Sequence, residues 1–149
     1  MKIFVTVGTT KFDSLIKIVD EKLFYLDYEV IMQISDGDYK PKNFEYFDFT
    51  NDIQSYFLQS DIIITHAGAG SIYELLELGK KIIIVPNLDR IDKHQSDIAN
   101  FMDSNNYAKS IYNLDNIVEI VKSIENHNFK KFKKKKFFKA QEIIDFIFE

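Results

Sequence analysis

Short apolar runs alternate along the chain with stretches in which apolar residues recur every three or four positions. The runs are typical of buried strands and cover residues 3–7, 30–34, 44–49, 61–65 and 82–85, with a weaker run at 107–111. Helical spacing covers residues 12–23, 52–59, 71–78, a stretch after Asp92, 114–124 and 137–147. Strands rich in β-branched residues that alternate with helices indicate a parallel sheet covered on both faces. The pattern predicts an α/β domain with a doubly wound parallel sheet.

Several residues have the types and spacing of helix caps. The spacing of a capping box occurs at three predicted starts: Thr10 with Asp13, Ser71 with Glu74, and Asp92 with Gln95. Gly79 follows the helical stretch at 71–78 and is expected to end it, because glycine tolerates the left-handed conformation found there.

Length and composition fit one globular domain. The chain has 149 residues, 46% hydrophobic and 28% charged, and no apolar run approaches the roughly 18 residues that span a bilayer. It contains no cysteine, which excludes disulfides and thiolate chemistry and favours a cytoplasmic location. The three histidines, His66, His94 and His127, are not at the spacing of metal ligands, so we expect no metal site.

Basic residues gather near the carboxyl end. Residues 130–139, KKFKKKKFFK, contain seven lysines and no acid, whereas the rest of the chain has 12 basic and 23 acidic residues and a charge near −11. This distribution argues against general nucleic-acid binding. The segment either lies on an anionic membrane or is a solvated linker to the last helix. We therefore divide the chain into a domain at 1–125 and a docking segment at 126–149.

Four segments with glycine or polar residues follow predicted strands: Gly8 to Thr10, Phe49 to Asn51, His66 to Ser71, and Asn87 to Gln95. In doubly wound sheets, ligands bind at the carboxyl ends of the strands, beside the point where the strand order reverses. Because the four segments belong to that edge, they predict a ligand site there.

The loop Gly68-Ala69-Gly70-Ser71 is open to two interpretations. Its glycines let backbone amides approach an anion at a helix start, or they serve only a tight strand-to-helix turn. Tyr73 stands where a dinucleotide fingerprint needs its third glycine, and no Gly-Lys-Ser/Thr follows as a P-loop requires.

Polar side chains of this edge have structural alternatives. Glu74 can accept hydrogen bonds from a ribose diol, but it also has the capping position opposite Ser71, and Gln95 has the same ambiguity. His66 is a candidate base at a strand end, although a lone histidine is more often structural. The Asp36-Gly37-Asp38 motif is interpreted as a turn rather than as a metal site.

Read in order, three segments resemble the C-terminal half of family 28 glycosyltransferases: VTVGTTKFDSLI at 5–16, FDFTNDIQSYFLQSDIIITHAGAGSIYELLELGKKIIIVPN at 47–87, and DRIDKHQSDIANF at 89–101. The resemblance extends to the two-subunit members, which act in asparagine-linked glycosylation and in bacterial capsule and exopolysaccharide synthesis. It implies a Rossmann-like fold, the donor-binding half of a GT-B enzyme.

The resemblance also implies a set of UDP-sugar contacts. Phe49 and Thr50 would border the uracil, and Glu74 would hold the ribose hydroxyls. The contacts near the diphosphate would be Gly8, Thr9, His66, Gly68, Gly70 and Ser71. The contacts near the donor sugar would be His94 and Gln95. The implied chemistry is inverting transfer of a hexose to an acceptor hydroxyl, with no cofactor and no obligatory metal.

A complete GT-B enzyme has a second half that binds the acceptor, and this chain has no room for it. The resemblance implies a membrane-anchored partner subunit, a lipid-linked acceptor and a peripheral position at the inner face of the membrane. No catalytic base is assigned within the chain. The alternative hypothesis is a non-catalytic enhancer or scaffold that stabilises a partner glycosyltransferase.

Overall fold

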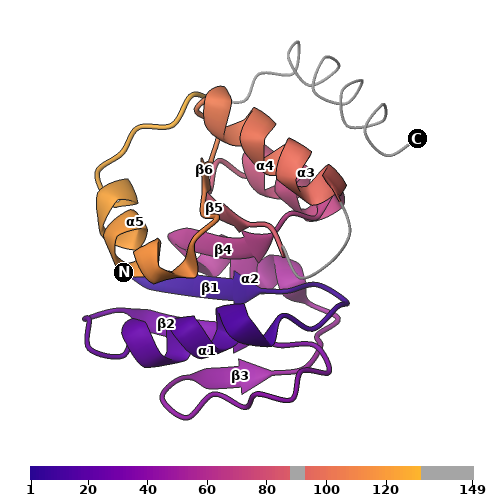
Figure 1. Ribbon diagram of the computed structural model, residues 1–149, viewed down its shortest axis with the longest axis vertical. Helices are drawn as coiled ribbons and strands as arrows, with labels where there is room; N and C mark the ends of the chain where they lie inside the picture. The colour runs from indigo at the N-terminus through magenta and orange to yellow at the C-terminus, as the bar shows by residue number, and fades with distance from the viewer. Residues whose placement is uncertain (88–92, 132–149) are drawn as a thin grey trace.

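The computed structural model describes residues 1–87 and 93–131, and for Ala69 and residues 93–95 it describes the backbone only. Strands and helices alternate along the chain, except that β2 is followed directly by β3 (Figure 1). The strands are β1 (Lys2–Thr6), β2 (Glu29–Gln33), β3 (Glu45–Phe47), β4 (Ile62–His66), β5 (Lys81–Val85) and β6 (Lys109–Ser110). The helices are α1 (Asp13–Lys22), α2 (Ile53–Gln59), α3 (Ala69–Glu77), α4 (Lys93–Ser104) and α5 (Ile117–Ile124), which follows the 3-10 turn η1 (Leu114–Asn116).

The strands form one parallel sheet in the order β3-β2-β1-β4-β5-β6. The central strand β1 pairs with β2 on one side, with Thr6 opposite Gln33, and with β4 on the other, with Thr6 opposite Thr65. The first three strands are added on one side of the sheet, from β1 at the centre to β3 at the edge. The chain then crosses back, and β4 pairs with the other side of β1. The strand order therefore reverses between β1 and β4, the position at which doubly wound sheets bind ligands.

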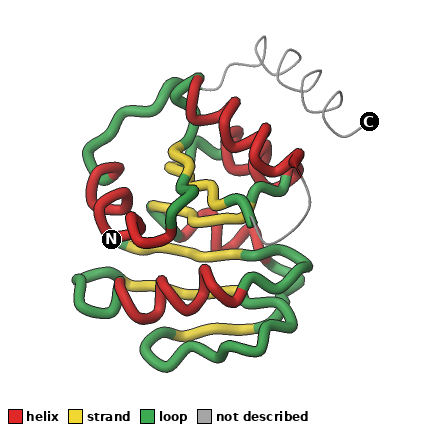
Figure 2. Tube along the Cα trace, in the orientation of Figure 1, coloured by secondary structure: helices red, strands yellow, loops and turns green. Residues whose placement is uncertain are grey.

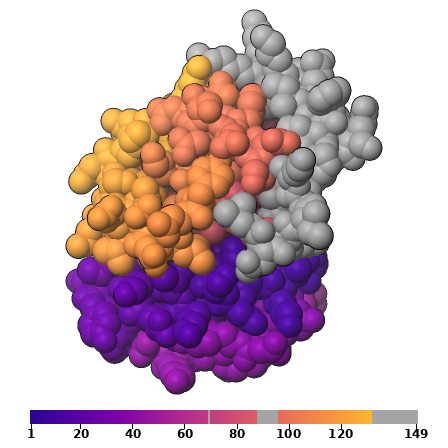
Figure 3. Space-filling model, viewed as in Figure 1, coloured from indigo at the N-terminus to yellow at the C-terminus, as the bar shows by residue number. Residues whose placement is uncertain are grey.

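Helices cover both faces of the sheet, as the apolar pattern predicts. In β4, Ile62 and Ile64 point into one core, which is shared with α1 and α5, and Ile63 points into the other, which is shared with α2, α3 and α4. Successive strand side chains point to opposite faces, so an all-isoleucine run fills both cores at once. Figure 3 shows α1 and α5 meeting on the first of these faces.

The predicted elements within the described residues are confirmed, with boundaries that shift by at most three residues. Gly79 lies just beyond α3 at a φ of 71°, as expected for the glycine that ends a helix. Its N–H donates to Leu76 and that of Lys80 donates to Leu75, each at 3.1 Å, which forms a Schellman motif. The predicted helix at 137–147 lies outside the described residues.

The predicted capping box at Thr10 and Asp13 is wrong. Helix α1 begins at Asp13 and its N-cap is Phe12, whose ring is buried in the core under α1. Packing of this aromatic ring sets where the helix starts, so Thr10 lies outside the helix. The Asp13 carboxylate instead accepts hydrogen bonds from the backbone N–H groups of Asp38 and Tyr39, each at 3.3 Å.

Candidate functional site

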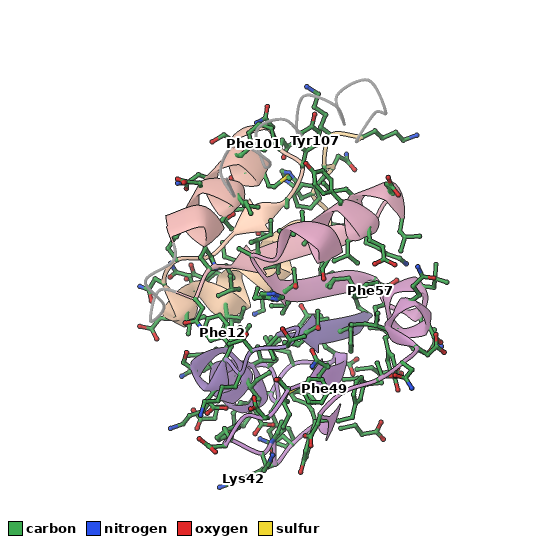
Figure 4. All side chains as sticks on the ribbon, turned by 90° about the vertical axis from the view of Figure 1, so that its right-hand side faces the viewer. Phe12, Lys42, Phe49, Phe57, Phe101 and Tyr107 are labelled. Carbon is green, nitrogen blue, oxygen red and sulfur yellow. The ribbon has the colours of Figure 1, made fainter. Side chains whose placement is uncertain are left out.

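The carboxyl ends of the strands gather the loops that carry most of the predicted site residues. These loops are the green segments on the right-hand side of Figure 2, beyond the strand arrowheads of Figure 1. Figure 4 looks onto this edge, with Phe49 in its lower half. The loop after β1 and the loop after β4 flank the reversal point, so Gly8 and His66 stand at its centre.

The imidazole of His66 lies between two glycines. A Cβ added to Gly8 would lie 2.6 Å from His66 Cε1, and one added to Gly68 would lie 2.6 Å from His66 Nε2. Gly8 also has a φ of 69°, which disfavours other residues. Both glycines are therefore required by the histidine ring that packs against them. The interpretation that Gly68 opens the loop to an anion is not needed to explain its presence.

Gly70 differs from these two glycines. It is exposed in the first turn of α3, and, apart from its chain neighbours and the backbone of its own helix, a Cβ added there would meet no described atom within 4 Å. The helix begins at Ala69, and its N-cap is Gly68, which has no side chain to donate or accept a capping bond. The N–H groups of the first turn point out of the helix end, where the helix dipole favours an anion. Open space at Gly70 gives an anion room to reach them.

The capping box at Ser71 and Glu74 is excluded by the start of α3. Because Gly68 is the N-cap, Ser71 is the third helical residue and Glu74 the sixth, so neither stands at a capping position. The two residues are three apart and share one side of the helix. Glu74 Oε1 instead accepts a hydrogen bond from Gln54 Nε2 of α2 at 2.5 Å. Its carboxylate is thus held at the surface between α2 and α3.

Phe49 and Thr50 follow β3 at the same edge. The Phe49 ring is 59% exposed, a large apolar surface at the end of a strand. Thr50 Oγ1 accepts a hydrogen bond from the Asp52 N–H at 3.1 Å, which fixes the turn into α2. Thr9 is exposed beside Gly8. An aromatic face and backbone groups are therefore exposed after β3, on the β2 side of the position where the strand order reverses.

The last predicted segment is described only in part. His94 and Gln95 lie in the first turn of α4, and their side chains lie outside the described residues, as does the loop at 88–92. The predicted cap at Asp92 falls in that loop. The docking segment at 126–149 is described only to residue 131, where the Lys130 N–H donates to the Asn106 carbonyl at 2.8 Å.

The Asp36-Gly37-Asp38 motif is a turn, as predicted. The Gly37 N–H donates to the Ile34 carbonyl at 3.3 Å, and Asp38 pairs with Lys11 at 3.1 Å. That hydrogen bond, and the charge of Asp38, raise the pKa of Lys11. The acidic motif is thereby tied to the loop that follows β1.

The loop after this turn is held by a buried carboxylate of α1. Asp20 accepts hydrogen bonds from Tyr39 Oη at 2.7 Å and from the backbone N–H groups of Lys42 and Asn43 at 2.9 Å. The bond to Asp20, followed by desolvation, raises the pKa of Tyr39 to about 12. This network fixes the chain between β2 and β3.

One residue of this edge was not selected from the sequence. Gln33, the last residue of β2, is 3% exposed, and its amide bonds the loop after β1 and the end of β3. A single polar residue in the apolar run Val30 to Ile34 was the available signal, because a buried amide must find hydrogen-bond partners. Which partners it finds depends on the sheet order.

A cavity of about 500 Å³ opens at the opposite edge, by the amino ends of β1, β2 and β3. It is lined by aromatic rings, including Phe24, Tyr28 and Phe44, together with Glu29 and Glu45. None of the predicted site residues lines it. Its lining has two carboxylates and one lysine, Lys2, which already pairs with Glu29 at 3.8 Å, so it does not suit a diphosphate.

Within residues 1–87 and 93–131, no helix is both long and apolar enough to cross a bilayer. Residues 2–147 match the family model of the glycosyltransferase family 28 C-terminal domain. The chain is 39% identical over 110 residues to the human UDP-N-acetylglucosamine transferase subunit ALG13, and 38% identical over 109 residues to the mouse protein. These alignments cover 65% and 64% of this chain but 10% and 9% of those relatives, so the chain spans about a tenth of their length.

Solved structures confirm the fold. The solution structure of ALG13 superposes with a TM-score of 0.66 at 18% identity, covering 99% of this chain and 96% of that one. MurG of Acinetobacter baumannii gives a TM-score of 0.57 at 19% identity, covering 99% of this chain and 51% of that one. The chain has the Rossmann-like architecture of one half of a GT-B glycosyltransferase.

Proposed function

The chain belongs to the glycosyltransferase family 28 C-terminal domains, and on that premise we propose that it is the donor-binding subunit of a UDP-sugar glycosyltransferase. Family membership supports the reaction class, and the human and mouse relatives are named for transfer of UDP-N-acetylglucosamine. We take UDP-N-acetylglucosamine as the donor to test first. The observation that carries the proposal is the start of α3, where open space at Gly70 adjoins backbone donors and the Glu74 carboxylate.

The nucleotide would lie across the carboxyl edge from β3 to α3. The exposed Phe49 ring offers a face for the uracil, and the Thr50 backbone borders the same position. Glu74 would accept hydrogen bonds from the ribose hydroxyls, releasing or sharing its bond with Gln54. The diphosphate would bind at Gly70 and Ser71, where the helix dipole favours negative charge.

The sugar would extend toward α4, with His94 and Gln95 near its hydroxyls. Gly8 and Thr9 would form the floor beneath the diphosphate. Transfer to an acceptor hydroxyl with inversion makes UDP the leaving group, and charge develops on its β-phosphate as the glycosidic bond breaks. The α3 amides stabilise that charge when they are fixed in place before the reaction, so no metal is expected to be obligatory.

No base is assigned to this chain. His66 ends β4 at the reversal point, but its ring packs between Gly8 and Gly68, which suits a wall of the site rather than a mobile base. The acceptor-binding half would come from a membrane-anchored partner and would supply the base. The acceptor would be a lipid-linked sugar at the inner face of the membrane. The lysines of residues 130–139 would add attraction to that anionic surface or to the partner.

The relatives reported above are named for N-acetylglucosamine transfer, so the expectation of capsule or exopolysaccharide synthesis gains no support from them. A non-catalytic enhancer of a partner transferase is the alternative function. Calorimetric titration of the full chain with UDP-N-acetylglucosamine, alone and with the partner, separates the two. The proposal requires saturable binding that UDP displaces, and binding in neither state would leave the enhancer role.

A further inference from the structure

The side-chain amide of Gln33 makes a complete set of hydrogen bonds at the carboxyl edge. Its Oε1 accepts from Thr6 Oγ1 at 2.6 Å and from the N–H groups of Val7 and Gly8 at 3.1 Å. Its Nε2 donates to the carbonyls of Gly8 at 2.9 Å and Asp48 at 2.8 Å. The orientation of the amide is fixed by this environment, because a flip would set N–H against N–H and carbonyl against carbonyl.

The amide replaces a missing strand partner. Beyond Thr6 the chain leaves the sheet, and Gly8 adopts a φ of 69°, which no regular strand pairing can satisfy. Gln33 bonds both the N–H and the carbonyl of Gly8, as a neighbouring peptide group would. The loop after β1 is thereby held in its left-handed conformation by one side chain.

Three parts of the site depend on that position. The Gly8 backbone packs on the His66 ring, whose other side packs on Gly68 at the start of α3. The carbonyl of Asp48, which also receives a bond from Gln33, directly precedes Phe49. A movement of the Gln33 amide would shift the β1 loop, the histidine wall and the end of β3 together.

We propose that Gln33 is a positioning residue for the donor site: it sets the β1 loop and the end of β3 at the separation that a UDP-sugar requires. This inference rests on the proposed function. Gln33 touches no ligand; it acts through Gly8 and Asp48. An apolar residue of similar size would fill the same space in the core but would leave the part-buried backbone groups of Gly8 and Asp48 without this partner.

The test compares Gln33→Glu with Gln59→Glu in the full chain. Above neutral pH the new carboxylate faces the carbonyls of Gly8 and Asp48 and repels both. We expect UDP-N-acetylglucosamine to bind about tenfold more weakly than to wild type, since displacement of the β1 loop and the end of β3 should cost at least one hydrogen bond to the nucleotide, which is worth about that much. At about pH 5, protonation of the buried carboxyl restores one donor, so the deficit relative to wild type should narrow. Gln59 is exposed at the opposite edge, where its Nε2 donates to Ser55 Oγ, so its variant should match wild type at every pH.

A ligand-free measurement keeps the positioning claim separate from the proposed function. In ¹⁵N and ¹³C spectra, Gln33→Glu should shift the Gly8 amide and the His66 ring resonances with pH, and Gln59→Glu should not. Thr6→Val changes the volume little but removes one donor to Gln33 and the hydroxyl that the Gly8 N–H also contacts at 3.4 Å, so its readout is the His66 ring, where it should give smaller shifts; it serves if Gln33→Glu fails to fold. Unmoved Gly8 and His66 resonances in the folded variants overturn the positioning role. If the variants show these shifts but the wild-type chain binds no UDP-sugar, the positioning role stands and the proposed function is rejected.

Discussion

Replacing Gly70 by alanine should make the folded chain more stable but should weaken its binding of UDP-sugars. Gly70 is the second residue of α3, and a methyl group there would meet none of the described atoms within 4 Å. Inside a helix, alanine stabilises the fold by about 1 kcal/mol relative to glycine. In the first turn we expect half of that gain, about 0.5 kcal/mol. The space that admits the methyl group is the space assigned to the diphosphate.

The loss of affinity can be bounded in the same way. A methyl group between the diphosphate and the α3 amides lengthens the hydrogen bonds that they make, and the loss of one charge-assisted bond is worth about 2 kcal/mol, or more than tenfold in Kd. Urea unfolding followed by circular dichroism measures the first effect, and calorimetric titration with UDP-N-acetylglucosamine measures the second. The two effects have opposite signs for the protein, which a general disturbance of the fold would not produce.

Gly79→Ala is the matched control. Gly79 also has open space around its Cα within the described part of the chain, but its φ of 71° lies in the left-handed region. Alanine there should cost about 1 kcal/mol of stability and leave the affinity for the nucleotide unchanged. If Gly70→Ala bound the UDP-sugar as tightly as wild type while Gly79→Ala behaved as stated, the diphosphate would not lie at the start of α3.

Three further predictions concern residues away from Gly70. Glu74→Ala should change the free energy of unfolding by less than about 0.5 kcal/mol, because only the exposed bond with Gln54 is lost, and should weaken UDP-sugar binding about tenfold; a variant with wild-type affinity would remove Glu74 from the site. Tyr39→Phe should cost about 1 kcal/mol, since the bond to buried Asp20 is lost. That bond keeps Tyr39 protonated in the fold from pH 10.0 to about 12, while the unfolded chain loses the proton, so its stabilisation is complete below pH 10 and disappears toward pH 12. Urea titrations at pH 8 and pH 11 should find the difference between wild type and Tyr39→Phe smaller at pH 11, and an equal difference would contradict the assignment. Neutralising the lysines of 130–139 should abolish a salt-sensitive binding to vesicles of anionic lipid; binding that is unchanged and insensitive to salt would refute the membrane role.

The fold could be predicted from the chain because its signals are local. The isoleucine runs, their β-branched content and the glycine after α3 each reflect the conformation of a few neighbouring residues. Strand order is less local, but the alternation of strands and helices allows few alternatives. The carboxyl edge could therefore be chosen as the candidate site before its geometry was known.

The start of a helix is harder to predict, because packing from elsewhere in the chain competes with local capping. Phe12 rather than Thr10 precedes α1 because its ring completes the core. Ser71 and Glu74 match a capping box, but β4 ends at His66 and the helix starts at Ala69, which places both residues inside it. In each case the capping pattern is present and a neighbouring element decides the outcome.

Contacts that cross the sheet could not be predicted at all. Gln33 bonds Gly8 across 25 residues and Asp48 across 15, and those partners exist only once β1, β2 and β3 are side by side. Likewise, the reason for glycine at positions 8 and 68 is a histidine ring that lies between them. The residue types were visible in the sequence, but their purpose depends on the assembled edge.

Chemical-shift mapping of the ¹⁵N-labelled full chain with UDP-N-acetylglucosamine is the sharpest test of a donor site at the carboxyl edge. If the nucleotide binds at this edge, we expect saturable shifts at Gly8, Phe49, Gly70 and Glu74, which come from three separate segments, and all four should report the same Kd. Shifts confined to the aromatic cavity at the amino ends of β1, β2 and β3 would contradict it, as would a spectrum that UDP-N-acetylglucosamine leaves unchanged.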